Sequence, residues 1–275
     1  MDLRVAGRVL PDLRVVPRAT VHLHEDADPL RVARLAERLR RDGVLRNPPI
    51  AAARPGEGFV VLDGANRMSA LAHLDLPAVP LQVVDYDDPA VHLEVWRHLI
   101  VEPIDLPGAL RAAGVLLEAS TRDAAAAALR AREIACYVLT NSHAFIVPLS
   151  PDHRVADTLS RVVASYKGVT RIYRVPTEDF DALVRGYGEI SAVVVFPHLE
   201  KQDILAIAGS PVKLPTGITR HLIPGRALRV NVPLEILAGS EEISRKHQRL
   251  QDLIRARLLE SSVRYYPEGA FLFDE

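Results

Sequence analysis

The segment best suited to chemistry follows the short apolar run Val60-Val61-Leu62 and reads Asp63-Gly64-Ala65-Asn66-Arg67. A carboxylate at a strand end, a glycine and a helix start that carries an arginine are typical of a phosphate-binding turn. Free N–H groups at a helix N-terminus attract anions, and an arginine one turn into the helix adds a positive charge. Asp-Gly is also a common turn, and Asp63 could simply cap the helix, so both interpretations stay open.

Three carboxylates lie just ahead of another predicted helix, in the segment His24-Glu25-Asp26-Ala27-Asp28-Pro29. Capping of that helix by Asp28 and its neighbours is one interpretation, because acidic side chains stabilise a helix N-terminus. Phosphoryl transfer is the other, because it needs one group to take the proton of the acceptor hydroxyl and another to hold Mg²⁺. An acidic loop beside a phosphate-binding turn would supply both groups.

A polar loop and a single tryptophan complete the candidates. The loop Pro215-Thr216-Gly217-Ile218-Thr219-Arg220-His221 combines hydroxyl, guanidinium and imidazole groups, which could receive the carboxylate of a small zwitterion. A plain surface loop is an equally good interpretation of its composition. Trp96, the only tryptophan, either packs in a core or forms the wall of a small-substrate pocket.

Composition argues against several classes of protein. The 275 residues are 48% hydrophobic, which is enough for one large or two modest globular domains. Lys and Arg number 34 against 35 Asp and Glu, so a basic surplus is absent and nucleic acid is disfavoured as the main partner. The N-terminus lacks a signal-peptide pattern and the apolar runs are too short to cross a bilayer, so we expect a cytoplasmic protein with no membrane partner.

Cysteine and histidine usage argues against a disulfide or a zinc site. Cys136 is the only cysteine, so neither an intramolecular disulfide nor a multi-thiolate metal site can form. We expect Cys136 to be a small buried apolar residue. The ten histidines show no His-Glu-x-x-His spacing or other metal-ligand pattern.

The predicted elements place these candidates at strand ends and helix starts. We expect a strand over 14–23, a helix over 29–43, a hairpin of 49–53 with 59–62, a helix ending near residue 73 and a strand over 79–84. A Pro-rich segment after residue 100 indicates a boundary between two domains, 1–100 and 101–275.

The second half of the chain mixes both kinds of element. We expect helices over 121–132, 154–165 and 241–260, and strands near 134–139, 144–148, 170–175, 192–196 and 227–232. The predicted fold class is therefore α+β, and the pattern does not determine the topology.

Several motifs in sequence order resemble the free serine kinases of the ParB/sulfiredoxin superfamily. They are the acidic turn at Glu25, the Asp63-Gly64-x-x-Arg67 turn, Trp96, Ser165-Tyr166-Lys167-Gly168 and the Gly217-Ile218-Thr219-Arg220-His221 loop. The resemblance extends to Gly225-Arg226-x-Leu228 and Asn231-Val232-Pro233-Leu234, which DNA-partitioning ParB proteins would not share. It implies an N-terminal ParB/sulfiredoxin-like nucleotide-binding domain and a mixed α/β C-terminal domain that contributes the substrate site.

Such kinases transfer a nucleotide phosphate to the hydroxyl of free L-serine, which gives O-phospho-L-serine. By resemblance, the donor phosphates of ATP or ADP would be surrounded, together with Mg²⁺, by Asp63, Gly64, Ala65, Asn66 and Arg67. Asp63 would also hold the metal. The product commonly feeds siderophore, diaminopropionate or cysteine synthesis.

The resemblance also implies the residues around serine. Glu25 matches the catalytic glutamate, and Trp96, Thr219 and His221 match positions that hold the substrate, with Arg220 beside them. A serine hydroxyl is a poor nucleophile until a base accepts its proton, and Glu25 is the predicted base.

Two further points concern the phosphate turn. Asp63 would orient Mg²⁺ or assist the base, and the roles of Asp63 and Glu25 could be exchanged. Arg67 and the helix N-terminus would neutralise charge on the transferring group. The chain departs from the kinases at Asn66, where they usually have a histidine, and an asparagine can bind a phosphate but cannot carry a proton or a charge.

Two alternatives belong to the same superfamily. A nucleotide-binding switch or transcriptional regulator would need a helix-turn-helix with a basic face, and the C-terminal half shows no convincing one. A sulfiredoxin-like reductase would need a catalytic thiol in the phosphate turn, where Asn66 precedes Arg67 and Cys136 is distant in sequence.

Overall fold

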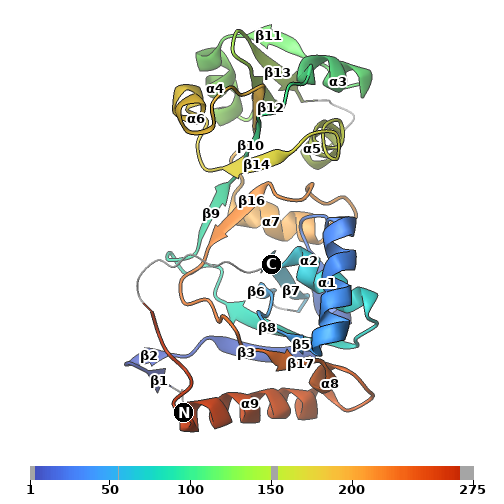
Figure 1. The fold of residues 1–275 in the computed structure, drawn as a ribbon, viewed down its shortest axis with the longest axis vertical. Coiled ribbons are helices and arrows are strands. Elements are labelled where there is room, and N and C mark those ends of the chain that lie inside the picture. Colours follow the sequence, from blue (N-terminus) through green and yellow to red (C-terminus); the bar gives the residue numbers. More distant parts are fainter. Residues whose placement is uncertain (1–3, 55, 150–153, 267–275) are drawn as a thin grey trace.

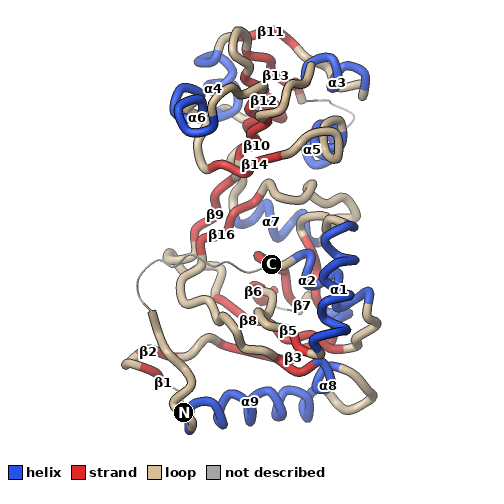
Figure 2. The backbone as a smooth tube through the Cα atoms, in the orientation of Figure 1, coloured by secondary structure: helices blue, strands red, loops and turns tan. Residues whose placement is uncertain are grey.

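The computed structural model describes residues 4–54, 56–149 and 154–266 and has an elongated shape with two lobes (Figure 1). The lower lobe in this view contains a five-stranded sheet and the upper lobe a six-stranded sheet. Two paired strands, β9 (His92–Val95) and β16 (Thr219–Leu222), lie between the lobes (Figure 2). The predicted mixture of helices and strands is confirmed.

The lower sheet has the strand order β3 (Asp12–Pro17), β8 (Ala78–Val84), β6 (Ile50–Arg54), β7 (Gly58–Asp63) and β4 (Val21–Leu23). β6 and β7 form the predicted hairpin, and β3 is antiparallel to β8. β6 runs parallel to β8, and β4 runs parallel to β7. β7 ends at Asp63, so the candidate phosphate turn begins at the end of this strand.

The predicted single strand over 14–23 is wrong. A 3-10 turn, Arg18–Thr20, separates β3 from β4, and the two strands lie at opposite edges of the sheet. The Arg18 N–H donates to the Pro77 carbonyl (2.9 Å) and the Thr20 hydroxyl donates to the Pro17 carbonyl (2.8 Å). These hydrogen bonds stabilise the turn in which the chain passes from one edge of the sheet to the other.

Helices α1 (Pro29–Asp42) and α2 (Ala65–His73) pack against each other beside the lower sheet (Figure 1). Asp28 caps α1, because its side chain accepts from the N–H groups of Leu30 and Arg31 at 3.1 Å each. The capping interpretation of Asp28 is therefore correct, and Gly43 ends the helix as expected.

The upper lobe is an antiparallel sheet covered by helices on both faces. Its strand order is β11 (Glu118–Ser120), β13 (Ala144–Pro148), β12 (Ile134–Leu139), β15 (Ala192–Val195), β10 (Arg97–Ile100) and β14 (Ile172–Val175). One face packs against α4 (Arg122–Arg130) and α6 (Phe180–Tyr187), and the other against α3 (Leu106–Ala112) and α5 (Val155–Ala164). Cys136 is buried in this sheet, as predicted.

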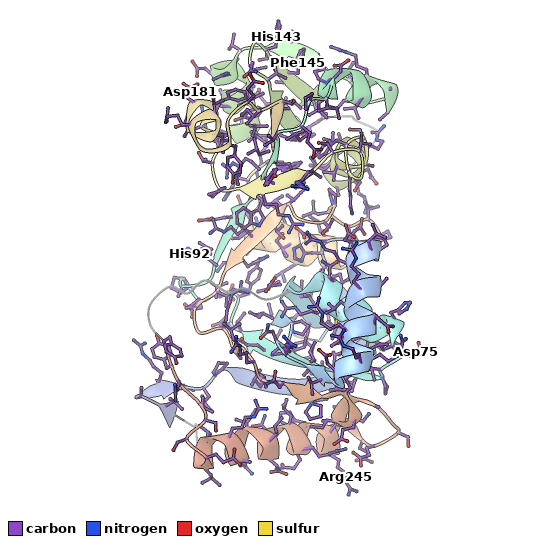
Figure 3. The ribbon with its side chains drawn as sticks, in the orientation of Figure 1. Asp75, His92, His143, Phe145, Asp181 and Arg245 are labelled. Atoms are coloured by element: carbon purple, nitrogen blue, oxygen red, sulfur yellow. The ribbon has the colours of Figure 1, made fainter. Side chains whose placement is uncertain are left out.

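The last part of the chain returns to the lower lobe. After α7 (Lys201–Ala208) and β16, the short strand β17 (Val232–Pro233) pairs with β5 (Val44–Leu45), and α8 (Leu234–Leu237) leads to α9 (Ile243–Leu259). α9 packs along β3, where the Gln251 side chain donates to the Leu13 carbonyl (2.7 Å). Arg245, labelled in Figure 3, points away from the body on the outer face of α9.

Two sequence-based predictions fail in this segment. Only Val232 of the predicted strand over 227–232 lies in a strand, β17, and an unpredicted strand, β16, begins inside the predicted loop over 215–221. β16 is polar, and it forms because β9 offers a partner edge. The division into domains 1–100 and 101–275 stays a prediction, and the structure adds that residues 232–259 pack with the first sheet.

One apolar cluster continues through both lobes. It includes Val60 and Leu62 from the lower sheet, Val194 from the upper sheet, and Leu214 and Ile218 from the segment before β16. A hairpin of β1 (Arg4–Val5) and β2 (Arg8–Val9) precedes β3. Within the described residues, the helices are too short or too polar to span a membrane.

Candidate active site

A pocket of about 470 Å³ lies where the two lobes meet. Segments far apart in sequence line it: the acidic turn, the phosphate turn, β14 and the chain from residue 216 to residue 228. The structure brings every predicted site residue to this pocket, namely Glu25, Asp63, Gly64, Ala65, Asn66, Arg67, Trp96, Thr219, Arg220 and His221.

The phosphate turn starts α2 without a side-chain cap. Gly64 is the N-cap residue with φ +107°, and in the described chain no side chain accepts from the first N–H groups of α2. A side chain at Gly64 would be strained at this φ, and its Cβ would lie 3.0 Å from the Arg67 guanidinium. The capping interpretation of Asp63 is therefore wrong, and the start of α2 faces the pocket.

Asp63 instead binds two arginines. Its Oδ2 accepts from Arg67 Nη2 at 3.0 Å and from Arg226 Nη1 at 2.6 Å. Burial raises the pKa of Asp63, but the charges and hydrogen bonds of the two arginines outweigh it and hold the pKa below its usual value. Two guanidinium groups around one carboxylate leave a net positive charge, which suits a phosphate.

Arg67 is fixed on its other side by the backbone of the lower lobe. Its Nη1 donates to the carbonyls of Asn47 and Pro48, at 3.0 Å each. A side chain held by three acceptors loses little conformational entropy when it binds a phosphate.

Glu25 is held by the segment that leads into β16. Its Oε1 accepts from the N–H groups of Ile218 (3.2 Å) and Thr219 (2.5 Å) and from the Thr219 hydroxyl (2.6 Å). Its Oε2 accepts from the Gly217 N–H at 3.0 Å. Leu214 pairs with the backbone on both sides of Glu25, through His24 and Asp26. The carboxylate is thus fixed in place. Oε2 accepts one hydrogen bond, whereas Oε1 accepts three.

His24 is a buried residue that the sequence analysis left without a role. Its Nδ1 lies 2.7 Å from the Val61 carbonyl and its Nε2 lies 2.8 Å from the Thr219 hydroxyl. A carbonyl only accepts, so Nδ1 carries a hydrogen. Burial lowers the pKa of His24, and the nearby Glu25 opposes this. The ring therefore links β7 to the residue that binds Glu25.

The pocket wall includes Trp96, Arg220 and His221. The Arg220 guanidinium lies 4.4 Å from the centre of the Trp96 ring and forms a 2.9 Å salt bridge with Glu94. His221 is buried, and its Nε2 lies 2.9 Å from the Tyr86 hydroxyl. Burial lowers the pKa of His221 to about 3, so at neutral pH this ring is an uncharged hydrogen-bonding group.

Asn66 connects the phosphate turn to the acidic turn that precedes α1. Its Oδ1 accepts from the Asp28 N–H at 2.8 Å, so the amide at the position where a histidine was expected is a structural link. The side chain ties the start of α2 to the start of α1. Both helix N-termini are therefore held at one side of the pocket.

Three further residues complete the site, and sequence reasoning gave them no role. Arg174 from β14 and Arg226 line the pocket. His98 from β10 binds the Gly217 carbonyl through Nε2 at 3.1 Å and the Tyr166 hydroxyl through Nδ1 at 2.8 Å. Arg226 belongs to the Gly225-Arg226-x-Leu228 stretch, which the sequence analysis used only for the family resemblance. Arg174 and His98 lie in ordinary strand sequences with no local signal.

Comparisons with known proteins give a consistent result. The chain is 23% identical over 263 residues to the ATP-dependent L-serine kinase SbnI of Staphylococcus aureus, which covers 96% of this chain and 97% of that protein. An ATP-dependent L-serine kinase of Staphylothermus marinus is 35% identical over 83 residues, 30% of this chain and 33% of that protein. No protein-family model matches the chain.

Solved structures extend the similarity to three dimensions. SbnI from Staphylococcus aureus with a C-terminal truncation superposes with a TM-score of 0.72 at 20% identity, covering 90% of this chain and 97% of that one. A free serine kinase in complex with AMP gives a TM-score of 0.73 at 19% identity, over 83% of this chain and 95% of that one. The chain has the fold of the free serine kinases. The resemblance drawn from the motifs is confirmed at this level.

Proposed function

We propose that this protein is a free serine kinase, which transfers the terminal phosphoryl group of ATP to the hydroxyl of L-serine and releases O-phospho-L-serine. The observation that supports this most is the convergence of Glu25 with the phosphate turn on one pocket, in a chain similar to SbnI over nearly its whole length. ATP is the proposed donor because both curated relatives are named ATP-dependent.

The donor phosphates bind at the phosphate turn. The N–H groups at the uncapped start of α2 face them, and Arg67 and Arg226 supply positive charge from either side of Asp63. This arrangement neutralises the charge that builds up on the phosphoryl group during transfer, which is usually a large catalytic contribution.

Mg²⁺ fits this site as an ion held mainly by phosphates. Both arginines bind Oδ2 of Asp63, and among the described residues Oδ1 has no hydrogen-bond donor, so one carboxylate oxygen remains open to a metal. The described chain contains no cluster of three or more acidic, histidine or cysteine ligands. Mg²⁺ commonly uses one or two carboxylates plus substrate phosphates, and bound there it would polarise the donor phosphates.

Serine lies between Glu25 and the wall formed by Trp96, Thr219 and His221. Glu25 accepts the serine proton on Oε2 as the oxygen–phosphorus bond forms and the bond to the nucleotide oxygen breaks. Thr219 holds Glu25 in position through its hydroxyl. Arg220 stacks on Trp96 in the same wall of the pocket.

Two broader parts of the proposal concern domains and product. Residues 1–100 form a ParB/sulfiredoxin-like nucleotide-binding domain, and residues 101–275 contribute the substrate site. The product would serve siderophore, diaminopropionate or cysteine synthesis.

The test is incubation of the pure protein with L-serine, Mg²⁺ and ATP, with product identified by ³¹P NMR. We expect O-phosphoserine with ATP, and a parallel reaction with ADP measures donor choice. Alanine should neither be phosphorylated nor compete well, because its missing oxygen leaves polar groups unpaired. If neither ATP nor ADP gives O-phosphoserine, the proposed function is rejected.

A further inference from the structure

The pocket is lined by more arginines than the phosphates require: Arg31, Arg67, Arg174, Arg220 and Arg226. Arg67 and Arg226 bind Asp63, and Arg220 binds Glu94. Arg31 and Arg174 have no salt bridge within the part of the chain that the structure describes. Of these two, Arg174 has its guanidinium against the segment that holds Glu25.

The position of Arg174 depends on a glycine. A Cβ built on Gly217 would lie 2.3 Å from Arg174 Nη2 and 2.4 Å from its Cζ, so the guanidinium occupies the space that a side chain would fill. The Gly217 N–H donates to Glu25 Oε2 at 3.0 Å. The guanidinium therefore packs on the residue whose N–H binds Oε2 of the proposed base, and Glu25 is among the charges that act on Arg174.

The upper lobe fixes this arrangement from behind. His98 pairs with Arg174 across β10 and β14, and its Nε2 donates to the Gly217 carbonyl at 3.1 Å. Burial lowers the pKa of His98 to about 4, so this ring is neutral and adds no competing charge. The same strand pair thus positions both the guanidinium and the glycine that it covers.

Serine chemistry makes a cation at this place useful. The hydroxyl and the α-carboxylate are carried on adjacent carbons, so a base that reaches the hydroxyl must have the carboxylate binder as a close neighbour. A guanidinium can bind a carboxylate with two parallel hydrogen bonds, which fixes orientation as well as affinity.

We propose that Arg174 binds the α-carboxylate of the amino-acid substrate and thereby aligns its hydroxyl with Oε2 of Glu25. This inference rests on the proposed serine kinase function. It makes the upper lobe a direct part of the substrate site. It also gives Gly217, which has a φ of +85° that favours glycine, the additional role of leaving room for the guanidinium.

The test compares the KM values for serine and ATP in the parent, Arg174→Ala and Arg174→Lys, with Arg171→Ala as the control. Arg171 is an exposed arginine three residues away that does not line the pocket. We expect Arg174→Ala to raise the KM for serine by roughly 10- to 100-fold, the scale of lost charge-assisted hydrogen bonds, with the KM for ATP within about twofold. Arg174→Lys should recover part of the loss, and the control should match the parent.

Two further arms identify the group that Arg174 binds. L-Serinamide has the hydroxyl but no carboxylate, so the parent should strongly prefer serine and Arg174→Ala should lose most of that preference. Gly217→Ala should raise the KM for serine by displacing the guanidinium. Combined with Arg174→Ala it should add less than its effect alone, because the displaced group is already gone and only the backbone strain of alanine at φ +85° remains.

The outcomes separate this inference from the proposed function. A parent protein that makes no O-phosphoserine rejects the function itself. An active parent whose KM for serine is unchanged by Arg174→Ala, or whose preference for serine over serinamide survives it, overturns the inference. A raised KM for serine in Arg220→Ala with no change in Arg174→Ala would assign the carboxylate to Arg220.

Discussion

The phosphate turn is a run of five adjacent residues, whereas the neighbourhood of Glu25 is assembled from segments up to 194 residues apart. In the turn, Asp63 and Arg67 meet because they are one helical turn apart. Around Glu25, the contacts join the acidic turn, the segment before β16 and the upper lobe. The first region depends on local geometry and the second on how two lobes pack.

This difference implies a division of labour. Changes in the phosphate turn should alter nucleotide affinity and leave serine recognition alone. Changes around Glu25 should alter serine phosphorylation or serine affinity while nucleotide binding persists. Variants that violate this division would show that the two regions act as one unit.

The largest expected effect is that of Glu25→Gln. Glutamine preserves the shape and can accept N–H bonds through its one oxygen, but its amide nitrogen is a donor and it cannot take a proton from serine. We expect serine phosphorylation to fall by roughly 10²-fold or more, with nucleotide affinity nearly intact. Single-turnover assays and ATP titration measure the two quantities.

Asp26→Asn is the matched control for this change. Asp26 is the adjacent carboxylate and does not line the pocket, so its variant should stay within a few-fold of the parent. Turnover of Glu25→Gln close to that of the parent would remove Glu25 from the role of base.

The next effect concerns the opposite side of the pocket. Arg67→Ala removes a positive charge that the Asn47 and Pro48 carbonyls hold in position. We expect ATP binding to weaken by about 1.5 to 3 kcal/mol, the scale of a charge-assisted hydrogen bond. Calorimetric titration measures it, and Arg40→Ala, an exposed arginine on α1, is the control. Unchanged affinity in a folded Arg67→Ala protein would place the phosphates elsewhere.

The phosphate turn was predictable because its signals are contiguous. A strand end, an Asp-Gly pair and a helix start carry their meaning within a few residues, and the Asp28 cap of α1 does so too. The same locality left one alternative open. The local sequence could not show whether Asp63 caps α2 or binds Arg67 and Arg226, because Arg226 lies 163 residues further along the chain.

The substrate side was only partly predictable. Its polar residues were visible in the sequence, but the resemblance, not the pattern, related Glu25 to Thr219. The strand β16 was missed because its edge partner β9 is distant in sequence, and strand pairing depends on packing as much as on propensity. Arg174 and His98 carry no local signal, because their importance arises only when β14 and β10 meet the Gly217 segment.

Thr219→Val tests the neighbourhood of Glu25 and should have a smaller effect than the two changes above. Valine keeps the shape but loses the hydroxyl that donates to Glu25 and contacts His24. We expect the KM for serine to rise by about tenfold with ATP affinity almost unchanged, since one hydrogen bond to a charged group is lost. His221→Ala should act in the same direction.

Thr219→Ser restores the hydroxyl and serves as the control. Its KM for serine should return to near the parent value. If Thr219→Val and His221→Ala bind and phosphorylate serine like the parent, the segment around β16 is structural and these two residues do not hold the substrate.

The smallest expected effect lies at the contact that joins the acidic turn to the phosphate turn. Asn66 Oδ1 accepts the Asp28 N–H at 2.8 Å, so Asn66→Ala leaves a part-buried donor without its partner. We expect the free energy of unfolding to fall by about 1 kcal/mol, measured by urea denaturation. Asn66→Asp keeps an acceptor oxygen, so it should retain more stability, but its added charge beside the phosphates should weaken ATP binding. If Asn66→Ala were as stable as the parent while Asn66→Asp bound ATP normally, Asn66 would neither link the two turns nor face the nucleotide, and the two sides of the pocket would be joined only through the lobes.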